Sequence, residues 1–243
     1  MQNILASLVA GNLSLLVHAD QEHLILIHYH ERPPYHITIE NGTVIGSLAV
    51  KTERAFRLSG IPYRWVKSPA KRQLKYLQKN QNRICLSGWF KNKKREKFAL
   101  FSRPIQQVGP IIGVAMLSNT RIKSNKSIES TFADNSLILL TKIGYSYGNY
   151  TDDLIKKLNP NRKLVSVENI NMLNMIKSAR ADYMLTTEEE ADSMLQQHNF
   201  SKSNYKYIRF KNMPYGNKRY ILCSLIVGSG VIERLNQWIP PLN

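Results

Sequence analysis

Three histidines near the start of the chain, His28, His30 and His36, lie on either side of a Glu31-Arg-Pro-Pro segment. Imidazole and carboxylate groups can bind metals or transfer protons. Histidines at alternating strand positions, however, point to opposite faces, and no spacing argument makes Glu31 and Glu40 an acid–base pair. The sequence contains no P-loop, H-E-x-x-H or dinucleotide-binding glycine pattern. We therefore predict no enzyme activity, no catalytic residue, no metal site and no cofactor.

A basic run is the second chemical feature. The chain has 34 Lys+Arg against 17 Asp+Glu, a formal net charge of +17. Residues 71–97 hold ten Lys or Arg and one acidic residue, with Tyr76, Trp89 and Phe90 interleaved. Such a surface could follow a phosphate backbone or attract anionic solutes, and basic helix faces are also often simply solvated. Nucleic-acid binding is the less favoured interpretation, because the N-terminal residues described next indicate export, and exported proteins rarely meet nucleic acid.

The N-terminus indicates export. Residues 1–19 contain no Lys, Arg, Asp or Glu, and their apolar run, residues 4–17, is shorter than the roughly twenty residues that span a bilayer. Val17-His18-Ala19 followed by Asp20 is typical of a signal-peptidase site. A basic segment at the very start is missing, which leaves a buried or amphipathic helix as the alternative. We predict that residues 1–19 are a signal peptide.

Hydrophobic patterning predicts strands alternating with helices. Expected strands are residues 23–29, 61–66, 83–89 and 111–117, with helices at 47–58 and 70–78. After a polar stretch at 118–130, a second set of strands at 136–143, 163–167 and 181–185 alternates with helices at 152–158 and 171–180. Alternation of this kind predicts an α/β fold with mostly parallel sheets flanked by helices, and two sets predict two lobes.

Several segments carry a resemblance to a known family. They are Gly42, Arg83-Ile-Cys-Leu-Ser-Gly-Trp89, the run from Arg95 to Pro104, and the closing Cys223–Asn236. With the RPPY, GWFKN and S-Y-G segments, they make the chain similar to bacterial extracellular solute-binding proteins of family 3, in a branch related to amino-acid-binding receptors. The resemblance covers nearly the whole chain after residue 19.

The resemblance implies a type II periplasmic-binding-protein fold. Lobe 1 would comprise residues 20–117 and 212–243, lobe 2 residues 118–211, and two hinge strands would join them. A monomeric periplasmic protein would capture a small anionic or zwitterionic solute in the interlobe cleft and pass it to a membrane permease of an ABC transporter. The alternative keeps the fold for a ligand sensor or an orphan periplasmic protein without a transporter.

The resemblance also implies which residues of lobe 1 bind the ligand. They are Tyr29, Tyr35, Ser87, Gly88, Trp89 and Arg95. Arg95 matches the family's carboxylate-binding Arg, and a guanidinium can hold a carboxylate through two hydrogen bonds. Its place in a basic run leaves a solvated position as the alternative, and Trp89 could equally be a core residue.

In lobe 2, the turn Ser146-Tyr147-Gly148 lies between a strand and a helix, where backbone N–H groups can bind an anion; a plain glycine-rich loop is the alternative. The family's amine-binding Asp would fall at Thr187, with Glu188 beside it. This departure removes the mark of α-amino-acid binding unless Glu188–Glu190 substitute for it.

Cys85 and Cys223 are the only cysteines. An even pair in an exported protein is compatible with a disulfide, whereas two buried thiols are the alternative. The family's strand order would place the two cysteines on neighbouring strands, so the resemblance implies a Cys85–Cys223 bridge.

Overall fold

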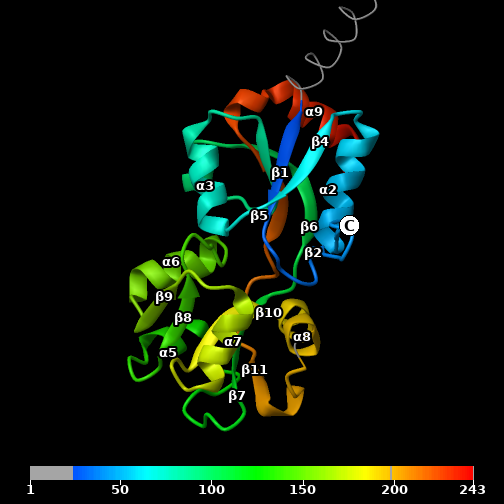
Figure 1. The fold of residues 1–243 in the computed structure, drawn as a ribbon. Helices are drawn as coiled ribbons and strands as arrows, with labels where there is room; N and C mark the ends of the chain where they lie inside the picture. Colours follow the sequence, from blue (N-terminus) through cyan, green and yellow to red (C-terminus); the bar gives the residue numbers. More distant parts are fainter. Residues whose placement is uncertain (1–23, 198, 243) are drawn as a thin grey trace, which may run out of the picture.

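Two five-stranded sheets, each flanked by helices, form two lobes joined by crossing strands (Figure 1). The computed structural model describes residues 24–197 and 199–242, so the predicted signal peptide at 1–19 lies outside the described residues. The α/β two-lobed fold expected from the sequence is thereby confirmed. Within the described residues, no helix has the length and apolar character needed to cross a membrane.

The first lobe contains a sheet with the order β4-β1-β5-β12-β6. Its strands are β1 (Ile25–Tyr29), β4 (Tyr63–Lys67), β5 (Ile84–Phe90), β6 (Leu100–Gln107) and β12 (Lys218–Cys223). β1 pairs in parallel with β4 and β5, whereas β12 runs antiparallel between β5 and β6. The helices of this lobe are α2 (Ser47–Leu58), α3 (Ala70–Lys79), α4 (Lys93–Glu96) and α9 (Ser229–Gln237). A small hairpin of β2 (Ile37–Thr38) and β3 (Val44–Ile45) precedes α2.

The second lobe contains a sheet with the order β11-β7-β10-β8-β9. Its strands are β7 (Ile111–Met116), β8 (Leu139–Lys142), β9 (Arg162–Val165), β10 (Tyr183–Thr187) and β11 (Tyr205–Ile208). Its helices are α5 (Ile128–Ala133), α6 (Asn149–Leu158), α7 (Asn169–Lys177) and α8 (Glu188–Gln197). β8 lies in parallel between β9 and β10, and β7 runs antiparallel to β10 and β11.

The chain passes between the lobes at two places, after β6 and after β11. Strand β7 belongs to the second sheet, although the sequence-based division at residue 117 placed it in lobe 1. Its apolar run is equally suitable for either sheet, and only its pairing with β10 and β11 assigns it. The first crossing therefore lies at residues 108–110.

The bounds of helix α2 agree with those predicted from the local hydrophobic pattern. It spans Ser47–Leu58, the predicted bounds, and buries a face that includes Leu48, Thr52 and Phe56 at helical spacing. Helix α5 was not predicted, because it lies at the end of a polar stretch. Its Ser127 side chain accepts a hydrogen bond from Ser130 N, and only Ile128, Thr131 and Phe132 are buried. So short a helix gives too little periodicity to detect.

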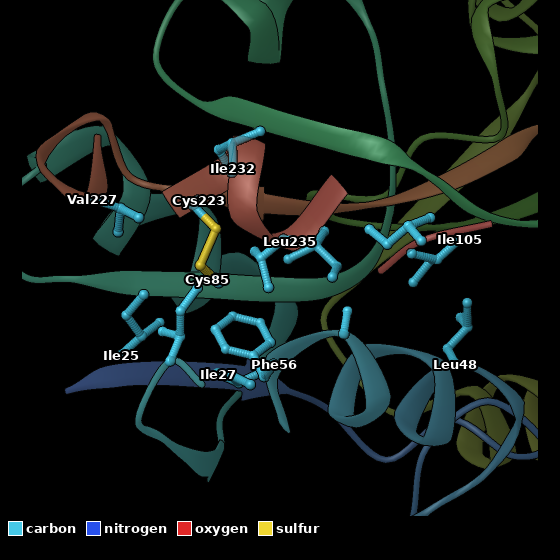
Figure 2. Packing of buried hydrophobic residues seen from close by; sticks show 14 of the residues in the cluster. Ile25, Ile27, Leu48, Phe56, Cys85, Ile105, Cys223, Val227, Ile232 and Leu235 are labelled. Carbon is cyan, nitrogen blue, oxygen red and sulfur yellow. A yellow bond between two sulfur atoms is a disulfide. The ribbon is translucent and has the colours of Figure 1, made fainter. Parts of the chain in front are cut away.

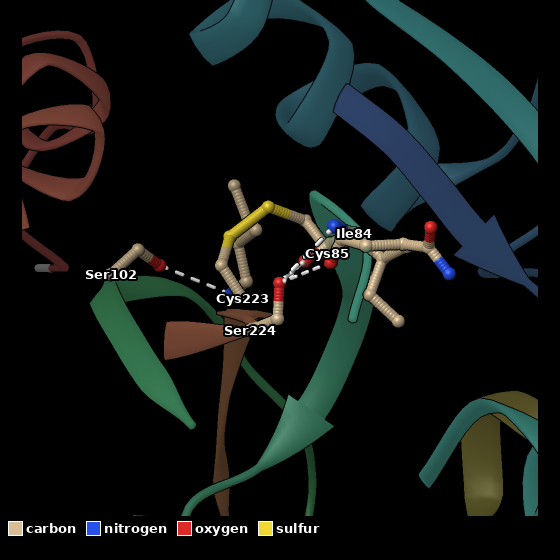
Figure 3. The surroundings of a disulfide bond; sticks show 7 residues. Ile84, Cys85, Ser102, Cys223 and Ser224 are labelled. Atoms are coloured by element: carbon tan, nitrogen blue, oxygen red, sulfur yellow. Dashed lines mark hydrogen bonds between the residues drawn. A yellow bond between two sulfur atoms is a disulfide. The ribbon is translucent and has the colours of Figure 1, made fainter. Parts of the chain in front are cut away.

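Cys85 and Cys223 form the predicted disulfide within the core of the first lobe (Figure 2). The two residues face each other on antiparallel β5 and β12 and are completely buried. Next to the bridge, the Ser224 hydroxyl donates to Ile84 O, and Ser102 Oγ accepts from Ile221 N (Figure 3). The bridge therefore lies where the backbones of three neighbouring strands are also tied by side chains.

Candidate functional site

The two lobes touch through a short segment that follows β1. Its His30 Nε2 lies 2.6 Å from Tyr145 Oη, and its Tyr35 Oη lies 2.9 Å from Thr187 Oγ1. Tyr145 and Thr187 belong to the second lobe, so this segment of the first lobe forms one wall of the interlobe cleft. The wall continues at Arg32, between these two contacts in the sequence.

Arg32 and Glu190 form an ion pair across the cleft. Arg32 Nε lies 2.6 Å from Glu190 Oε1, and Nη2 lies 2.8 Å from Oε2. The Arg32 guanidinium also lies over the rings of Tyr35 and Tyr145, 5.4 and 5.0 Å from their centroids. Burial alone would raise the pKa of Glu190, but attraction to Arg32 outweighs it and keeps that pKa below its usual value. Both groups are therefore charged.

Arg219 is the most deeply buried cation of the cleft. It lies on β12, is 2% exposed, and its guanidinium is 4.6 and 4.4 Å from the ring centroids of Tyr35 and Phe90. Nη1 donates to Gly88 O at 2.9 Å, whereas Nε and Nη2 have no partner within the part of the chain that the structure describes. Burial, with repulsion from Arg32, lowers the pKa of Arg219 to about 10.

Gly88 allows the close packing beneath Arg219. Its φ of +77° lies in the left-handed region, and a Cβ there would be 2.5 Å from Leu48 Cδ1. Glycine at this position therefore lets β5 turn its carbonyl toward Arg219 while α2 packs against the strand. Gly88 was predicted to contact the ligand; in the structure its carbonyl oxygen accepts a hydrogen bond from Arg219 and so orients that side chain.

Arg95, the predicted carboxylate-binding residue, is buried and lies on the short helix α4. Its guanidinium is 4.7 Å from the Trp89 ring centroid, and Nη1 donates to Phe90 O at 2.6 Å. Nη2 reaches Gly144 O of the second lobe at 3.4 Å. Burial lowers the pKa of Arg95 to about 10, although attraction to Asp152 opposes this. The solvated alternative for Arg95 is thus excluded by its position.

Two small cavities lie at the centre of the cleft. One, of about 20 Å³, is lined by Arg32, Arg95, Arg219 and Gly88–Phe90, with His30, Tyr145 and Ser146. The other, of about 10 Å³, lies between Arg32, Arg219 and Glu190 and the strand ends of the second lobe. Each is about the size needed for one water molecule. A solute of several atoms therefore enters the centre only when the lobes move apart.

A much larger groove of about 1020 Å³ adjoins these cavities. It shares Arg95, Tyr145 and Ser146 with the inner cavities, and its outer walls come from α3 and the loop before α6. Basic side chains from both lobes line it: Lys71, Arg72, Lys75, Lys94, Arg95 and Lys142. Asp152 and Glu168 are the acidic residues that line it within the described chain. The approach to the cleft is therefore strongly basic.

Lys142 belongs to the second lobe and lies at the boundary between groove and cavities. Its Nζ is 3.0 Å from Glu168 Oε2 and 4.8 Å from the Tyr145 ring centroid. Burial lowers the pKa of Lys142, although attraction to Glu168 opposes this. Tyr145 thus has a cation at its ring from each lobe, Arg32 and Lys142.

Ser146 and Tyr147 of the predicted turn line the inner cavities, but the N–H groups of Tyr147 and Gly148 are engaged. Tyr147 N donates to Asp152 Oδ1 at 2.8 Å, and Gly148 N donates to Ser146 Oγ at 3.3 Å. The expectation that these N–H groups are free to bind an anion is therefore wrong for Tyr147 and Gly148. The reason is local: Asp152, in the first turn of α6, reaches back and satisfies the turn.

Five predicted residues do not line the groove or the two inner cavities: Tyr29, Tyr35, Ser87, Gly148 and Glu188. Tyr29 packs against Trp65 and bonds Thr38, because alternate residues of β1 face opposite sides and its neighbours His28 and His30 take the other face. The Ser87 hydroxyl is within 2.8 Å of His36 Nε2 and 2.7 Å of Thr52 Oγ1, inside the first lobe. Glu188 is half-exposed and pairs with Arg209. Thr187, by contrast, does line the inner cavity.

Sequence reasoning did not assign Arg32, Lys142, Glu190 or Arg219 to the site. Glu190 was considered only as one of three consecutive glutamates that could replace an amine-binding Asp. Arg219 carried a weak signal, because it is a charged residue at the second position of a strand whose last three residues, Ile221–Cys223, are apolar and buried. A buried arginine needs hydrogen-bond acceptors or a negative charge close to its guanidinium, and the residues next to Arg219 in the sequence do not provide them.

Among the described residues, no group of three or more His, Cys, Asp or Glu is arranged to hold a metal ion. His28, His30 and His36 instead bond Ser68, Tyr145 and Ser87 respectively. Buried histidines with hydroxyl partners are ordinary structural groups. The charged groups at the centre of the cleft are mainly buried cations.

No protein-family model and no curated protein sequence matches this chain. Solved structures do match over most of its length. An ancestral arginine-binding protein bound to arginine superposes with a TM-score of 0.70 at 17% identity, covering 89% of this chain and 91% of that one. Holo ArgBP from T. maritima gives a TM-score of 0.70 at 15% identity, with 91% of each chain covered. A substrate-binding protein of an amino acid ABC transporter gives 0.67 at 16% identity, covering 89% and 91%. The fold is therefore that of two-lobed periplasmic binding proteins.

Proposed function

We propose that this protein is a periplasmic solute-binding protein that captures a small anionic or zwitterionic solute between its lobes. One observation carries the proposal: Arg219 is buried at the centre of the cleft with two N–H-bearing nitrogens that lack partners in the described chain. Leaving charged donors unpaired in a buried site is costly, and an anionic group that enters the cleft removes the cost.

The surroundings of Arg219 support the same function. Arg95 lines the same cavity, and the groove that leads to it is lined mainly by basic side chains. A positive cleft concentrates anions and speeds their capture. The interlobe contacts of Arg32 and Tyr35 would then reform as the lobes close over the solute. A membrane permease would receive the solute; in support, a protein with this fold is the substrate-binding protein of an amino acid ABC transporter.

The test is a thermal-shift screen of the purified protein against amino acids, organic acids, amines, sugars and an oligonucleotide. A solute at a hundred times its Kd adds about 2.7 kcal/mol to the free energy of unfolding. We expect shifts with carboxylate-bearing solutes and none with sugars or amines. A shift with the oligonucleotide alone would overturn the receptor proposal and make the basic surface the functional feature.

Two variants then test the assigned cations by calorimetry. Arg219→Met and Arg95→Met should each weaken binding of the identified solute by about 10- to 100-fold, the worth of a charged hydrogen bond. Arg83→Met is the matched control, because Arg83 also has an unpaired Nε but lines a separate pocket away from the cleft. Unchanged affinity in both cleft variants would reject the site.

A further inference from the structure

The charges of the cleft show which kind of anion it would hold, and this inference rests on the proposed function. Within residues 24–197 and 199–242, Glu190 is the one carboxylate that lines the two inner cavities. Glu190 is therefore the one described residue of these cavities that could both accept hydrogen bonds from an incoming ammonium group and neutralise its charge. The partners of Glu190 therefore decide whether the cleft accepts amines.

Glu190 is already saturated. Besides the two bonds from Arg32, its Oε1 accepts from Asn169 Nδ2 at 2.7 Å and its Oε2 from Thr186 Oγ1 at 2.8 Å. Its side chain is 1% exposed. The Arg32 guanidinium thus occupies the place at Glu190 that an ammonium group of a solute would otherwise take.

The adjacent acidic residues offer no substitute. Glu188 pairs with Arg209, and neither Glu188 nor the exposed Glu189 lines the inner cavities. Thr187, which does line a cavity, is neutral, and its hydroxyl is bonded to Tyr35. Glu189 Oε2 accepts from Tyr35 Oη at 3.5 Å, and neither Glu189 nor Glu188 lines an inner cavity, so the end of β10 presents no free carboxylate there.

Two cations of the inner cavity, by contrast, have no carboxylate of the described chain at ion-pair distance. In the part of the chain that the structure describes, neither Arg95 nor Arg219 forms an ion pair, whereas Arg32 pairs with Glu190 and Lys142 with Glu168. Asp152 attracts Arg95 but bonds Ser146 and Tyr147 N instead. Arg95 and Arg219 line one cavity, so a single small solute can reach both.

We infer that the solute is a small dianion without an ammonium group, such as a short dicarboxylate, held between Arg95 and Arg219. Arg32 supplies from within the protein the positive charge that an amino acid would bring to Glu190. This assigns Arg32 a role in specificity: it excludes α-amino acids from a cleft whose fold is shared with amino-acid receptors.

The experiment compares matched solutes by isothermal titration calorimetry on the full-length mature protein. Glutarate and glutamate differ by the α-amino group, as do succinate and aspartate, and butyrate removes one carboxylate. Sulfate and phosphate test whether a compact inorganic dianion is the source of the charge. We expect a dicarboxylate to bind at least about tenfold more tightly than its amino acid and than butyrate.

Arg32→Met gives a second, independent readout. It frees Glu190, so glutamate should gain affinity relative to glutarate by about tenfold or more. Adding Glu190→Gln to this variant should remove the gain. Arg64→Met, at an exposed position of β4, is the control and should leave the ratio unchanged.

The outcomes separate the two proposals. If glutamate or aspartate binds the wild-type protein as well as its amine-free partner, the receptor function stands and the dianion inference is overturned. Equal binding of butyrate and glutarate also overturns it. Tighter binding of sulfate or phosphate than of any dicarboxylate supports a dianion but replaces the dicarboxylate with an inorganic one. If none of these anions binds, the dianion inference is overturned, whereas the receptor proposal is decided by the wider thermal-shift screen.

Discussion

Arg32 and Glu190 are 158 residues apart in sequence, yet their side chains form a two-point ion pair that links the two lobes. Each lobe supplies one charge, and Glu190 is held in place by Asn169 and Thr186 of its own lobe. The pair therefore contributes to the closed arrangement of the lobes rather than to either core.

The first prediction follows from this geometry. Glu190→Gln removes the negative charge while nearly conserving shape, so Arg32 is left buried without a counter-charge, a costly state. We expect the lobes to separate and Arg32 to become hydrated. Small-angle X-ray scattering should show a larger radius of gyration than for the wild type. Glu188→Gln is the control, because Glu188 pairs with Arg209 within the second lobe. An unchanged radius for Glu190→Gln would argue against this role.

The second prediction concerns the disulfide. Its residues are separated by 138 positions, and removing a native bridge costs about 2–5 kcal/mol. Cys85→Ala with Cys223→Ala should lower the free energy of unfolding in urea by this amount. Solute affinity should change little, because Cys85 lies near the beginning of β5 whereas the cleft is formed by its last residues, Gly88–Phe90. A stability equal to that of the wild type would show that the bridge is dispensable.

The third prediction is a loss of stability toward acid. Burial lowers the pKa of His36 to about 3, and it also lowers the pKa values of His28 and His30. These folded-state values lie below the unfolded value of about 6.5, so the unfolded chain binds more protons as pH falls. The stabilisation is complete above pH 6.5 and declines below it.

Urea unfolding at pH 7.5, 6 and 5 measures this decline. Each histidine contributes up to about 1.4 kcal/mol per pH unit once the pH is below 6.5. Asp and Glu side chains titrate mainly below this window. His36→Gln should reduce the slope by about one proton. A free energy of unfolding that stays flat between pH 7.5 and 5 would contradict buried neutral histidines.

The fourth prediction tests the turn beside the hinge. Gly148 has φ +93°, and a Cβ there would be 2.1 Å from Asn217 Nδ2. Gly148→Ala should therefore destabilise the protein by about 1–3 kcal/mol. Combining it with Asn217→Ala should restore part of the lost free energy of unfolding, because the steric clash with Asn217 is removed while the unfavourable φ of residue 148 remains. Gly230→Ala, on α9 with nothing within 4 Å of its Cβ, is the control and should be neutral or slightly stabilising. Equal effects at both glycines would contradict this explanation.

Much of the fold could be predicted because it depends on near neighbours in sequence. Helix α2 has the predicted bounds, and β1 lies within a predicted apolar run. Arg95 was placed in the cleft because its spacing to Phe101 matches the family's pattern, and it does line an inner cavity; its role in binding stays a prediction. By contrast, the lobe to which β7 belongs depends on pairing with β10, which lies far along the chain. The hydrophobicity of β7 does not indicate that its pairing partner is β10.

The sequence by itself determined an α/β chain of two sheets and a strongly basic balance of charge. It left open whether Cys85 and Cys223 are bridged, which the family resemblance implied and the structure shows. Only the tertiary structure decided which cations are neutralised and which are not. Arg32 and Lys142 have carboxylate partners, whereas Arg95 and Arg219 share a cavity without one. The physical reason is that ion pairing depends on separations of a few ångströms in space. The residues that meet in this cleft come from two lobes and from segments more than a hundred positions apart.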